Sequence, residues 1–300
     1  MTRLVKVMMK VLILGVAGML GHKLYQVLTS EFDTTGTIRG TYNDISKYGF
    51  FRKSAIVPNT SALEISRVEE LIKGIGPDVV INCIGIVKSL EKTSGRLLNI
   101  WANSLFPQQL YQCCKKKETR LIHISTDCVF SGKKGNYRED EPSDAEDIYG
   151  KTKYLGEVGE EGALTIRTSL IGRELSTSNG LVEWFLSNQG GEVNGFSNAI
   201  FTGFPTLHFA RIIADVITKY PDLTGIYHVS SEPISKFGLL SLVKKKMGLD
   251  IRIKEYADFV CDRSLDSTLF RTKTGFVPLP WDEMIEEFAG DAIQYRRWRE

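Results

Sequence analysis

One tyrosine and one lysine in this sequence have the types and the spacing that proton transfer requires. They lie in residues 149–153, whose sequence is YGKTK, and side chains at i and i+4 share one face of a helix. A nearby ammonium favours the phenolate, so Lys153 is expected to lower the pKa of Tyr149 from about 10 toward neutrality. Upstream, Thr126 ends an aliphatic run, where its hydroxyl could hold a substrate carbonyl in line. Tyr149 is therefore a candidate proton donor or acceptor.

A glycine-rich turn near the N-terminus has the pattern of a phosphate-binding loop. Residues 15–21, GVAGMLG, follow an aliphatic run and precede a predicted helix. Glycines here let the chain turn tightly and let the backbone approach a pyrophosphate, while the helix N-terminus presents unpaired N–H groups. The preceding strand and following helix supply the context that the motif needs. The sequence therefore predicts a dinucleotide site that includes Gly15, Gly18, Met19, Leu20 and Gly21.

The residue that reads the cofactor's ribose is expected at the end of the second strand. Arg39 occurs there, followed by Gly40 and Thr41, and no carboxylate occurs before Asp44. A carboxylate would bind the 2′-hydroxyl of NAD, whereas an arginine suits a 2′-phosphate through charge-assisted hydrogen bonds. The pattern favours NADP(H) as the cofactor and leaves NAD(H) open.

Short aliphatic runs alternate with longer helical stretches, which is typical of a parallel sheet covered on both faces. The predicted strands are 11–14, 37–39, 55–57, 78–84, 120–125, 164–168 and 225–229, and the helices between them include 20–29, 67–73, 101–116 and 149–160. We expect an α/β fold with a doubly wound parallel sheet, a Rossmann sheet of about seven strands. Residues 1–172 and 205–230 would form this dinucleotide-binding domain, and residues 173–204 and 231–300 a smaller C-terminal substrate-binding domain. The ligand cleft is expected between the two.

The bulk composition argues against several classes of partner. The formal net charge of the 300 residues is +2, so nothing indicates binding to nucleic acid or to an anionic membrane. The five cysteines have no Cys-x-x-Cys spacing, which suits free thiols in a reducing compartment. The aliphatic run after the basic residues 1–10 is too short for a signal peptide or a spanning helix. We expect a cytoplasmic protein whose first nine residues form an extension before the first strand. A homodimer is one assembly that the sequence leaves open.

Further segments along nearly the whole chain carry a resemblance to a known family. They are residues 77–83 (PDVVINC), 101–103 (WAN), 166–168 (IRT), 204–206 (FPT), 225–228 (GIYH) and 263–267 (RSLDS), with Trp281 after a proline. Together with the glycine turn and the Tyr149/Lys153 pair, they make the sequence resemble the extended short-chain dehydrogenases/reductases. Within that group it is most similar to the dTDP-4-dehydrorhamnose reductase family.

The resemblance implies an NADP(H)-dependent oxidoreductase that reduces a 4-keto-6-deoxy sugar linked to a nucleotide, in deoxysugar or polysaccharide biosynthesis. It implies that Thr126, Tyr149 and Lys153 are catalytic: Tyr149 would supply the proton, and Lys153 would also hold the nicotinamide ribose. To the cofactor site it adds Cys83, Gly85 and Asn103, beside Tyr149 and Lys153. To the substrate side it assigns Asp127, Cys128, Phe130, Trp184, Phe204 and Arg263.

Two positions depart from the family pattern and leave the identity of the sugar open. Cys128 replaces the usual tyrosine, and Ser264 replaces the usual proline. Cys128 also stands where related sugar-nucleotide dehydratases carry a glutamate base, so dehydration is not expected. The alternatives are a reductase of a UDP-linked 2-acetamido sugar, an epimerase, and a non-catalytic regulatory subunit of a methionine adenosyltransferase.

The remaining polar candidates are interpreted as structural. His22 and His123 have no partner at metal-ligand spacing, so no metal site is expected. The terminal segment 296–299, RRWR, is expected to be a surface tail.

Overall fold

Seven parallel strands form the main sheet, in the order β11-β6-β5-β4-β1-β2-β3. The computed structural model describes residues 8–299, apart from the side chains of residues 91, 92 and 299. Residues 1–7, part of the expected N-terminal extension, lie outside the described residues. The strands are β1 (Lys10–Leu14), β2 (Asp33–Thr37), β3 (Ile56–Val57), β4 (Val79–Asn82), β5 (Arg120–Thr126), β6 (Ala163–Thr168) and β11 (Gly225–His228). Strand order reverses between β1 and β4, which confirms the doubly wound sheet.

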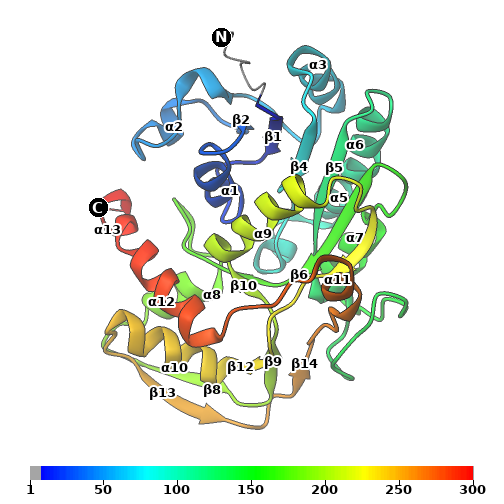
Figure 1. The fold of residues 1–300 in the computed structure, drawn as a ribbon. Coiled ribbons are helices and arrows are strands. Elements are labelled where there is room, and N and C mark those ends of the chain that lie inside the picture. Colours follow the sequence, from blue (N-terminus) through cyan, green and yellow to red (C-terminus); the bar gives the residue numbers. More distant parts are fainter. Residues whose placement is uncertain (1–7, 300) are drawn as a thin grey trace, which may run out of the picture.

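Helices cover both faces of this sheet (Figure 1). They are α1 (Gly21–Leu28), α2 (Asn43–Ser46), α3 (Ile65–Ile75), α4 (Glu91–Ser94), α5 (Arg96–Ile100), α6 (Phe106–Lys115), α7 (Ile148–Leu155) and α9 (Thr206–Lys219). The side chains of β1 alternate between two buried clusters. Val11 and Ile13 join the cluster that includes α1 and α9, whereas Leu12 and Leu14 join the one that includes α3 and α6. Burial on both faces explains why the strand is a continuous aliphatic run.

Three elements differ from the sequence prediction. Strand β2 begins at Asp33, well before the predicted 37–39, because Thr34 and Thr37 are buried and Gly36 leaves room for the side chain of Val16. Helix α7 ends at Leu155, since Gly156 lies against the carbonyl of Asn103 and has no space for a Cβ. The helix predicted at 101–116 begins with the π-helical turn Trp101–Leu105 before α6.

The remaining elements lie outside the main sheet. They are β7 (Leu170–Ile171), α8 (Leu181–Leu186), β8 (Glu192–Phe196), β9 (Ala199–Phe201), β10 (Phe204–Pro205), β12 (Ile234–Ser235), α10 (Lys236–Met247), β13 (Arg252–Tyr256), β14 (Cys261–Asp262), α11 (Thr268–Thr274), α12 (Trp281–Ala292) and α13 (Gln294–Arg299). Those around α10, β8, β9 and β13 occupy the lower part of Figure 1. Helix α10 packs against β8, β13 and α12. The C-terminal helices then return to α1, where Tyr295 contacts His22. The predicted division into two domains stays a prediction.

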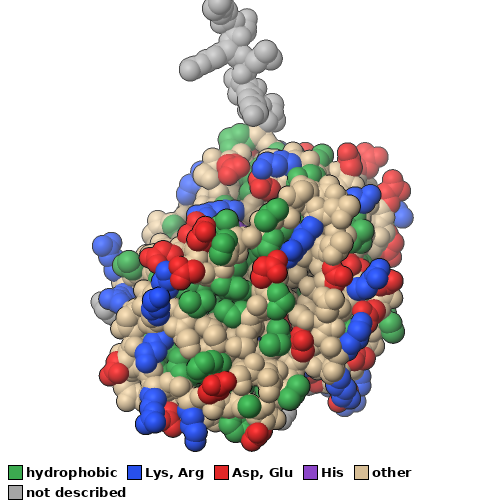
Figure 2. All heavy atoms as spheres, turned by 60° about the horizontal axis from the view of Figure 1, so that its bottom comes forward, with side chains coloured by type: hydrophobic (Ala, Val, Ile, Leu, Met, Phe, Trp, Pro, Cys, Tyr) green, Lys and Arg blue, Asp and Glu red, His purple; other side chains and the backbone are tan. Residues whose placement is uncertain are grey.

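Within residues 8–299, no helix is long and apolar enough to cross a bilayer. On the face drawn in Figure 2, cationic and anionic side chains are interspersed, without a block of one sign. This distribution agrees with the small formal net charge of +2.

Candidate active site

The glycine turn between β1 and α1 requires glycine at two positions, Gly15 and Gly21. Gly15 has a φ of +88°, in the left-handed region that favours glycine. A Cβ at Gly21 would collide with the carbonyl oxygen of Gly15. Within the described part of the chain, no side chain caps the N-terminus of α1, and the first turn of this helix holds no acidic residue. The turn is therefore a backbone cradle that suits a diphosphate at a helix N-terminus.

A cleft of about 630 Å³ lies along the carboxyl ends of β1, β4, β5 and β6. The predicted cofactor residues Gly18, Met19, Leu20, Cys83 and Gly85 line it. Gly15 and Gly21 shape the turn behind this wall. The cradle and the cleft together fit a dinucleotide, because a bound diphosphate at the turn would extend along the strand ends.

Asn103 supports the cleft from behind and does not line it. Its Oδ1 accepts a hydrogen bond from Ile86 N at 2.8 Å, and its Nδ2 donates to Ile86 O at 3.1 Å. The same Nδ2 lies 3.3 Å from Thr152 Oγ1 on α7. Asn103 therefore fixes the loop after β4 to the helix that carries Tyr149 and Lys153.

Thr126, Tyr149 and Lys153 lie together on the wall of the cleft. Thr126 ends β5, and its Oγ1 accepts a hydrogen bond from Cys128 N at 3.2 Å. Asp147 caps α7 by accepting from Gly150 N at 2.7 Å, which fixes the start of the helix. One turn later, Lys153 Nζ donates to the carbonyl oxygen of Ile124 on β5, at 2.7 Å. The three side chains thus come from β5 and α7, which the hydrogen bond from Lys153 to Ile124 connects.

The acid–base properties of the pair differ from the sequence expectation. Burial raises the pKa of Tyr149, and the hydrogen bond with the Thr126 side chain opposes this only in part. The expectation that Lys153 brings the phenol toward neutrality is therefore wrong for this structure. Burial also lowers the pKa of Lys153, to about 8, although the charges of Glu157 and Cys83 oppose the shift. Tyr149 is accordingly a protonated phenol near neutral pH, suited to donate a proton.

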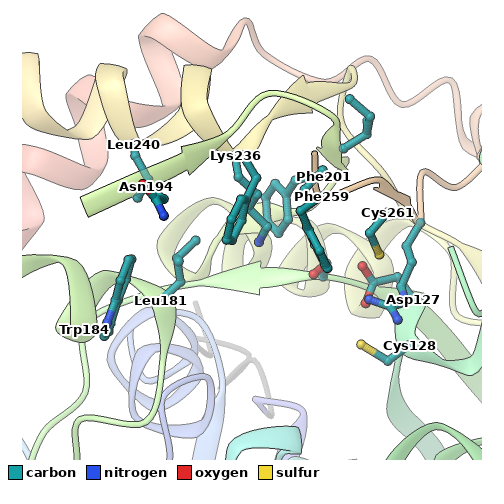
Figure 3. A pocket seen from close by; sticks show the side chains of 15 residues that line it. Asp127, Cys128, Leu181, Trp184, Asn194, Phe201, Lys236, Leu240, Phe259 and Cys261 are labelled. Atoms are coloured by element: carbon teal, nitrogen blue, oxygen red, sulfur yellow. The ribbon is translucent and has the colours of Figure 1, made fainter. Parts of the chain in front are cut away.

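A smaller cavity of about 270 Å³ adjoins the cleft, and Asp127, Cys128 and Ser169 line both spaces. Figure 3 shows Leu181 and Trp184 at one end of it, Asp127, Cys128 and Cys261 at the other, and Phe201, Phe259 and Lys236 between them. Burial raises the pKa of the Cys128 thiol to about 12. The thiol is therefore uncharged, and Cys128 is a small apolar side chain in the cavity wall, not a nucleophile.

Two cations face this smaller cavity. Lys236, the first residue of α10, has its Nζ 4.6 Å from the centroid of the Phe201 ring. Arg263 donates from Nε to the carbonyl oxygen of Phe130 at 2.8 Å. Neither side chain forms an ion pair with any residue that the structure describes. The Asp127 carboxylate lines the same cavity and acts electrostatically on both cations without forming an ion pair with either. Two cations in a concave, partly aromatic site are suited to bind an anionic ligand.

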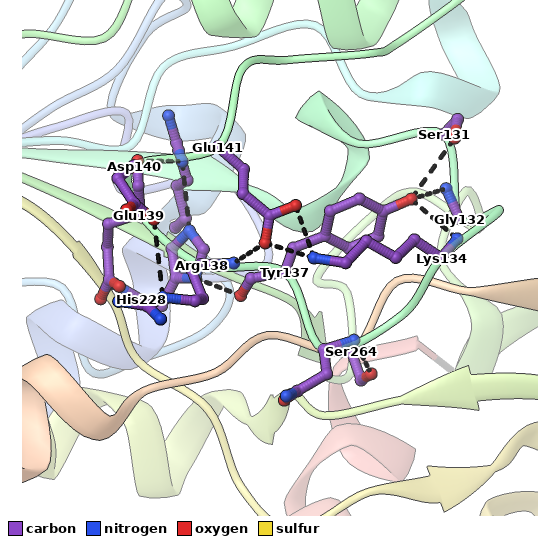
Figure 4. A network of polar contacts seen from close by, with 12 residues as sticks. Ser131, Gly132, Lys134, Tyr137, Arg138, Glu139, Asp140, Glu141, His228 and Ser264 are labelled. Carbon is purple, nitrogen blue, oxygen red and sulfur yellow. Dashed lines mark hydrogen bonds and ion pairs between the residues drawn. The ribbon is translucent and has the colours of Figure 1, made fainter.

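The second departure, Ser264, follows β14 and bonds to the loop between β5 and α7. Its Oγ accepts a hydrogen bond from Asn136 N at 2.7 Å, a bond that the family's proline could not accept. Figure 4 shows the loop around Tyr137, whose hydroxyl oxygen accepts from Gly132 N and Lys134 N, each at 3.2 Å. Ser264 therefore ties this loop to the segment that presents Arg263.

Besides Asn103 and the turn glycines Gly15 and Gly21, three more predicted residues do not reach either cavity. The Phe130 ring is fully buried and stacks on Tyr137, with centroids 4.2 Å apart. Phe204 is likewise buried, between His208, Phe209 and Phe276. Arg39 is exposed beyond the end of β2. The predicted Asp127, Cys128, Trp184 and Arg263 do line the smaller cavity.

Sequence reasoning missed Lys236, Phe259, Cys261 and Glu174. The first three line the smaller cavity, and Glu174 lines the larger one, where Thr177 and the Gly180 amide bond its carboxylate. They belong to segments that are distant in sequence from the predicted site residues and reach the cavities only through tertiary packing. A weak signal existed only for Lys236, which follows the helix-capping Ser235.

The chain is similar to characterised proteins over most of its length. The family model described as RmlD substrate binding domain matches residues 9–292. The spore coat polysaccharide biosynthesis protein SpsK of Bacillus subtilis is 27% identical, over 94% of this chain and 97% of that protein. A dTDP-4-dehydrorhamnose reductase of Streptomyces griseus is 31% identical, but over only 49% of this chain and 43% of that protein. Methionine adenosyltransferase 2 subunit beta of Xenopus tropicalis is 26% identical, over 76% and 69%.

Solved structures share the fold. A hypothetical dTDP-4-dehydrorhamnose reductase from Sulfolobus tokodaii superposes with a TM-score of 0.74 at 27% identity, covering 91% of this chain and 98% of that one. The dTDP-4-dehydrorhamnose reductase of Bacillus anthracis in complex with NADP gives 0.75 at 22% identity, covering 95% and 99%.

Proposed function

The chain belongs to the RmlD substrate-binding domain family, and on that premise we propose that it is an NADP(H)-dependent reductase of a nucleotide-linked 4-keto-6-deoxy sugar. Such a reaction serves deoxysugar or polysaccharide biosynthesis, the process named for the relative SpsK. The observation that carries the proposal is the position of Thr126, Tyr149 and Lys153. They lie on the wall of the dinucleotide cleft, next to the place where it meets a cavity lined by the cations Lys236 and Arg263.

The reduction adds a hydride to a keto carbon and a proton to its oxygen. NADPH, when bound, supplies the hydride. Tyr149 supplies the proton, because its raised pKa keeps the phenol protonated until the carbonyl oxygen gains negative charge. The Thr126 hydroxyl stands beside that phenol and can hold the carbonyl oxygen in line. Lys153 keeps two of its three N–H donors free of Ile124, and these suit the nicotinamide ribose.

The end of β2 supports a preference for NADP(H). The carboxylate that follows it in the sequence, Asp44, accepts from Thr41 N at 2.7 Å and from the Thr41 hydroxyl at 3.2 Å. Asp44 is therefore engaged in its own turn instead of presenting a carboxylate to a ribose 2′-hydroxyl. Arg39, which is exposed, is the group that we assign to the 2′-phosphate. NAD(H) remains open as a weaker cofactor.

The smaller cavity is the site that we assign to the nucleotide and sugar. Lys236 and Arg263 supply positive charge for a diphosphate, and Phe201, Phe259 and Trp184 supply apolar surface for a base. Cys128 stands where the two cavities meet. The small side chain at this point leaves space for a larger sugar substituent, so a UDP-linked 2-acetamido sugar is the second substrate candidate.

The experiment that tests this function is an assay of the purified protein with NADPH. Its substrates are 4-keto-6-deoxy sugars linked to dTDP, UDP and GDP. The proposal expects one NADPH consumed for each alcohol formed. A sugar inverted without net consumption of cofactor would mean an epimerase. No turnover, together with a stable complex with a methionine adenosyltransferase catalytic subunit, would favour the alternative of a non-catalytic regulatory subunit; the Xenopus relative is named as subunit beta of such an enzyme.

We also propose a homodimer and a cytoplasmic location. Helices α5 and α7 pack against each other and expose apolar side chains, with Leu97 84% and Leu155 63% accessible. An exposed apolar face of this kind suits packing against a second copy of the chain. All five cysteines are free thiols, as expected in a reducing compartment. Light scattering in solution would test the dimer, and a monomeric mass would contradict it.

A further inference from the structure

A buried chain of hydrogen bonds connects the C-terminal helix to the glycine turn. Tyr295 of α13 and His22 of α1 are both fully buried, and the phenol oxygen lies 2.5 Å from His22 Nε2. The other ring nitrogen, Nδ1, lies 2.8 Å from the carbonyl oxygen of Gly18. Because Gly18 lines the larger cleft, the chain ends at the wall of the dinucleotide site.

The chemistry of these groups fixes the direction of each hydrogen bond. The Gly18 carbonyl can only accept, so the proton must be on His22 Nδ1, which leaves Nε2 as the acceptor. Tyr295 must then donate its hydroxyl proton to Nε2. Burial lowers the pKa of His22 to about 3, so the imidazole is neutral near pH 7. Burial also raises the pKa of Tyr295, which keeps the donor proton in place.

The Tyr295 ring is held in position from several sides. Lys23 Nζ and the guanidinium carbon of Arg173 each lie 5.2 Å from its centroid. The Trp298 ring packs edge-on against it, with centroids 4.9 Å apart, and also contacts Phe50. The terminal segment is therefore not the free surface tail that the sequence suggested: its tryptophan anchors α13 beside α1 (Figure 1).

We propose that Tyr295 and His22 are positioning residues for cofactor binding, which hold the glycine turn in the form that presents its amides to a diphosphate. This inference rests on the proposed function, in which that turn binds the cofactor. Without the Tyr295 hydroxyl, Nε2 would be a buried acceptor without a donor, and that penalty exists only in the binding form. The imidazole or the turn would then shift, and the apparent Kd would rise as the binding form becomes less populated.

Tyr295→Phe tests this directly, because it removes one hydroxyl and keeps the ring. The expected result is a rise in the Kd for NADPH of about tenfold, the scale of one hydrogen bond at a buried site. At saturating NADPH, kcat should be nearly unchanged, so the effect appears in the KM for NADPH. The matched control is Phe288→Leu, which loosens α12 at a buried position whose ring is not among the described rings that contact His22 or Tyr295. It should lower the Tm by a similar amount and leave the Kd for NADPH unchanged.

His22→Phe and the double variant complete the test. If both residues act through one chain, adding Tyr295→Phe to His22→Phe should not raise the Kd further. Additive effects, or an unchanged Kd in Tyr295→Phe, would overturn the positioning role. An equal rise in the Phe288→Leu control would overturn it too, because loosened packing would then suffice. Wild-type protein that binds no NADPH would instead overturn the proposed function on which the inference rests.

Discussion

Gly150 packs directly against the carbonyl oxygen of Cys128, and a Cβ at Gly150 would collide with that oxygen and with the Ala145 side chain. This close approach joins the first turn of α7, which carries Tyr149, to the end of β5, which carries Thr126. The distance between the proton donor and the hydroxyl beside it is therefore set by a residue that has no functional group of its own.

Gly150→Ala should displace Tyr149 from Thr126 without removing either side chain. We expect kcat to fall by about 100-fold, since small misplacements of a catalytic group have effects of that size. Gly74→Ala is the matched control: Gly74 also lies in a helix, and its Cβ would meet nothing within 4 Å. The control should retain full activity, with a Tm unchanged or slightly higher. Equal activity of the two variants would show that the close approach does not set the geometry.

Lys236→Met should weaken the binding of the sugar nucleotide and spare that of NADPH. Charge-assisted contacts contribute about 1.5–3 kcal/mol, which predicts a rise in KM for the sugar nucleotide of about 10- to 100-fold. Lys245→Met, on the same helix but without a place in either cavity, is the control. Titration calorimetry with UDP or dTDP and with NADPH separates the two sites. A rise in the Kd for NADPH alone would contradict the assignment of the smaller cavity.

Arg39→Ala should change the cofactor preference. If the guanidinium binds the 2′-phosphate, the Kd for NADPH should rise by about 10- to 100-fold while that for NADH stays nearly constant. Fluorescence titration of both cofactors measures the ratio. A loss of the same size for both would mean that Arg39 supports the structure and does not read the phosphate.

The pH dependence of the reaction should report Lys153. Its folded-state pKa is about 8, so the ammonium is present below that pH and is lost above it. The value of kcat/KM should therefore fall as the pH rises through about 8. The charge of Glu157 raises the pKa of Lys153 and so opposes the effect of burial. Glu157→Gln should therefore shift the fall of kcat/KM to lower pH. A profile that stays flat up to about pH 10, near the ordinary pKa of lysine, would contradict the prediction.

The sequence predicted those parts of the site that local motifs encode. The glycine turn, Thr126 and the Tyr149/Lys153 spacing each belong to one strand end or one helix turn, and the parallel sheet brings such ends together. The resemblance assigned Phe130 to the substrate side, but its ring turns into a core with Tyr137. Lys236 reaches the cavity only through packing between distant segments, which no local pattern records. The raised pKa of Tyr149 depends on burial, which spacing alone does not give.

The central claim is that this chain reduces a keto sugar with Tyr149 as the proton donor. Its most direct test is the rate of NADPH consumption by wild-type and Tyr149→Phe protein with the best 4-keto-6-deoxy sugar nucleotide. The substitution removes the phenol hydroxyl and keeps the ring. We predict a fall in kcat of about 100-fold or more, the scale of general acid catalysis, with the Kd for NADPH retained. Near-normal turnover by Tyr149→Phe would contradict the account.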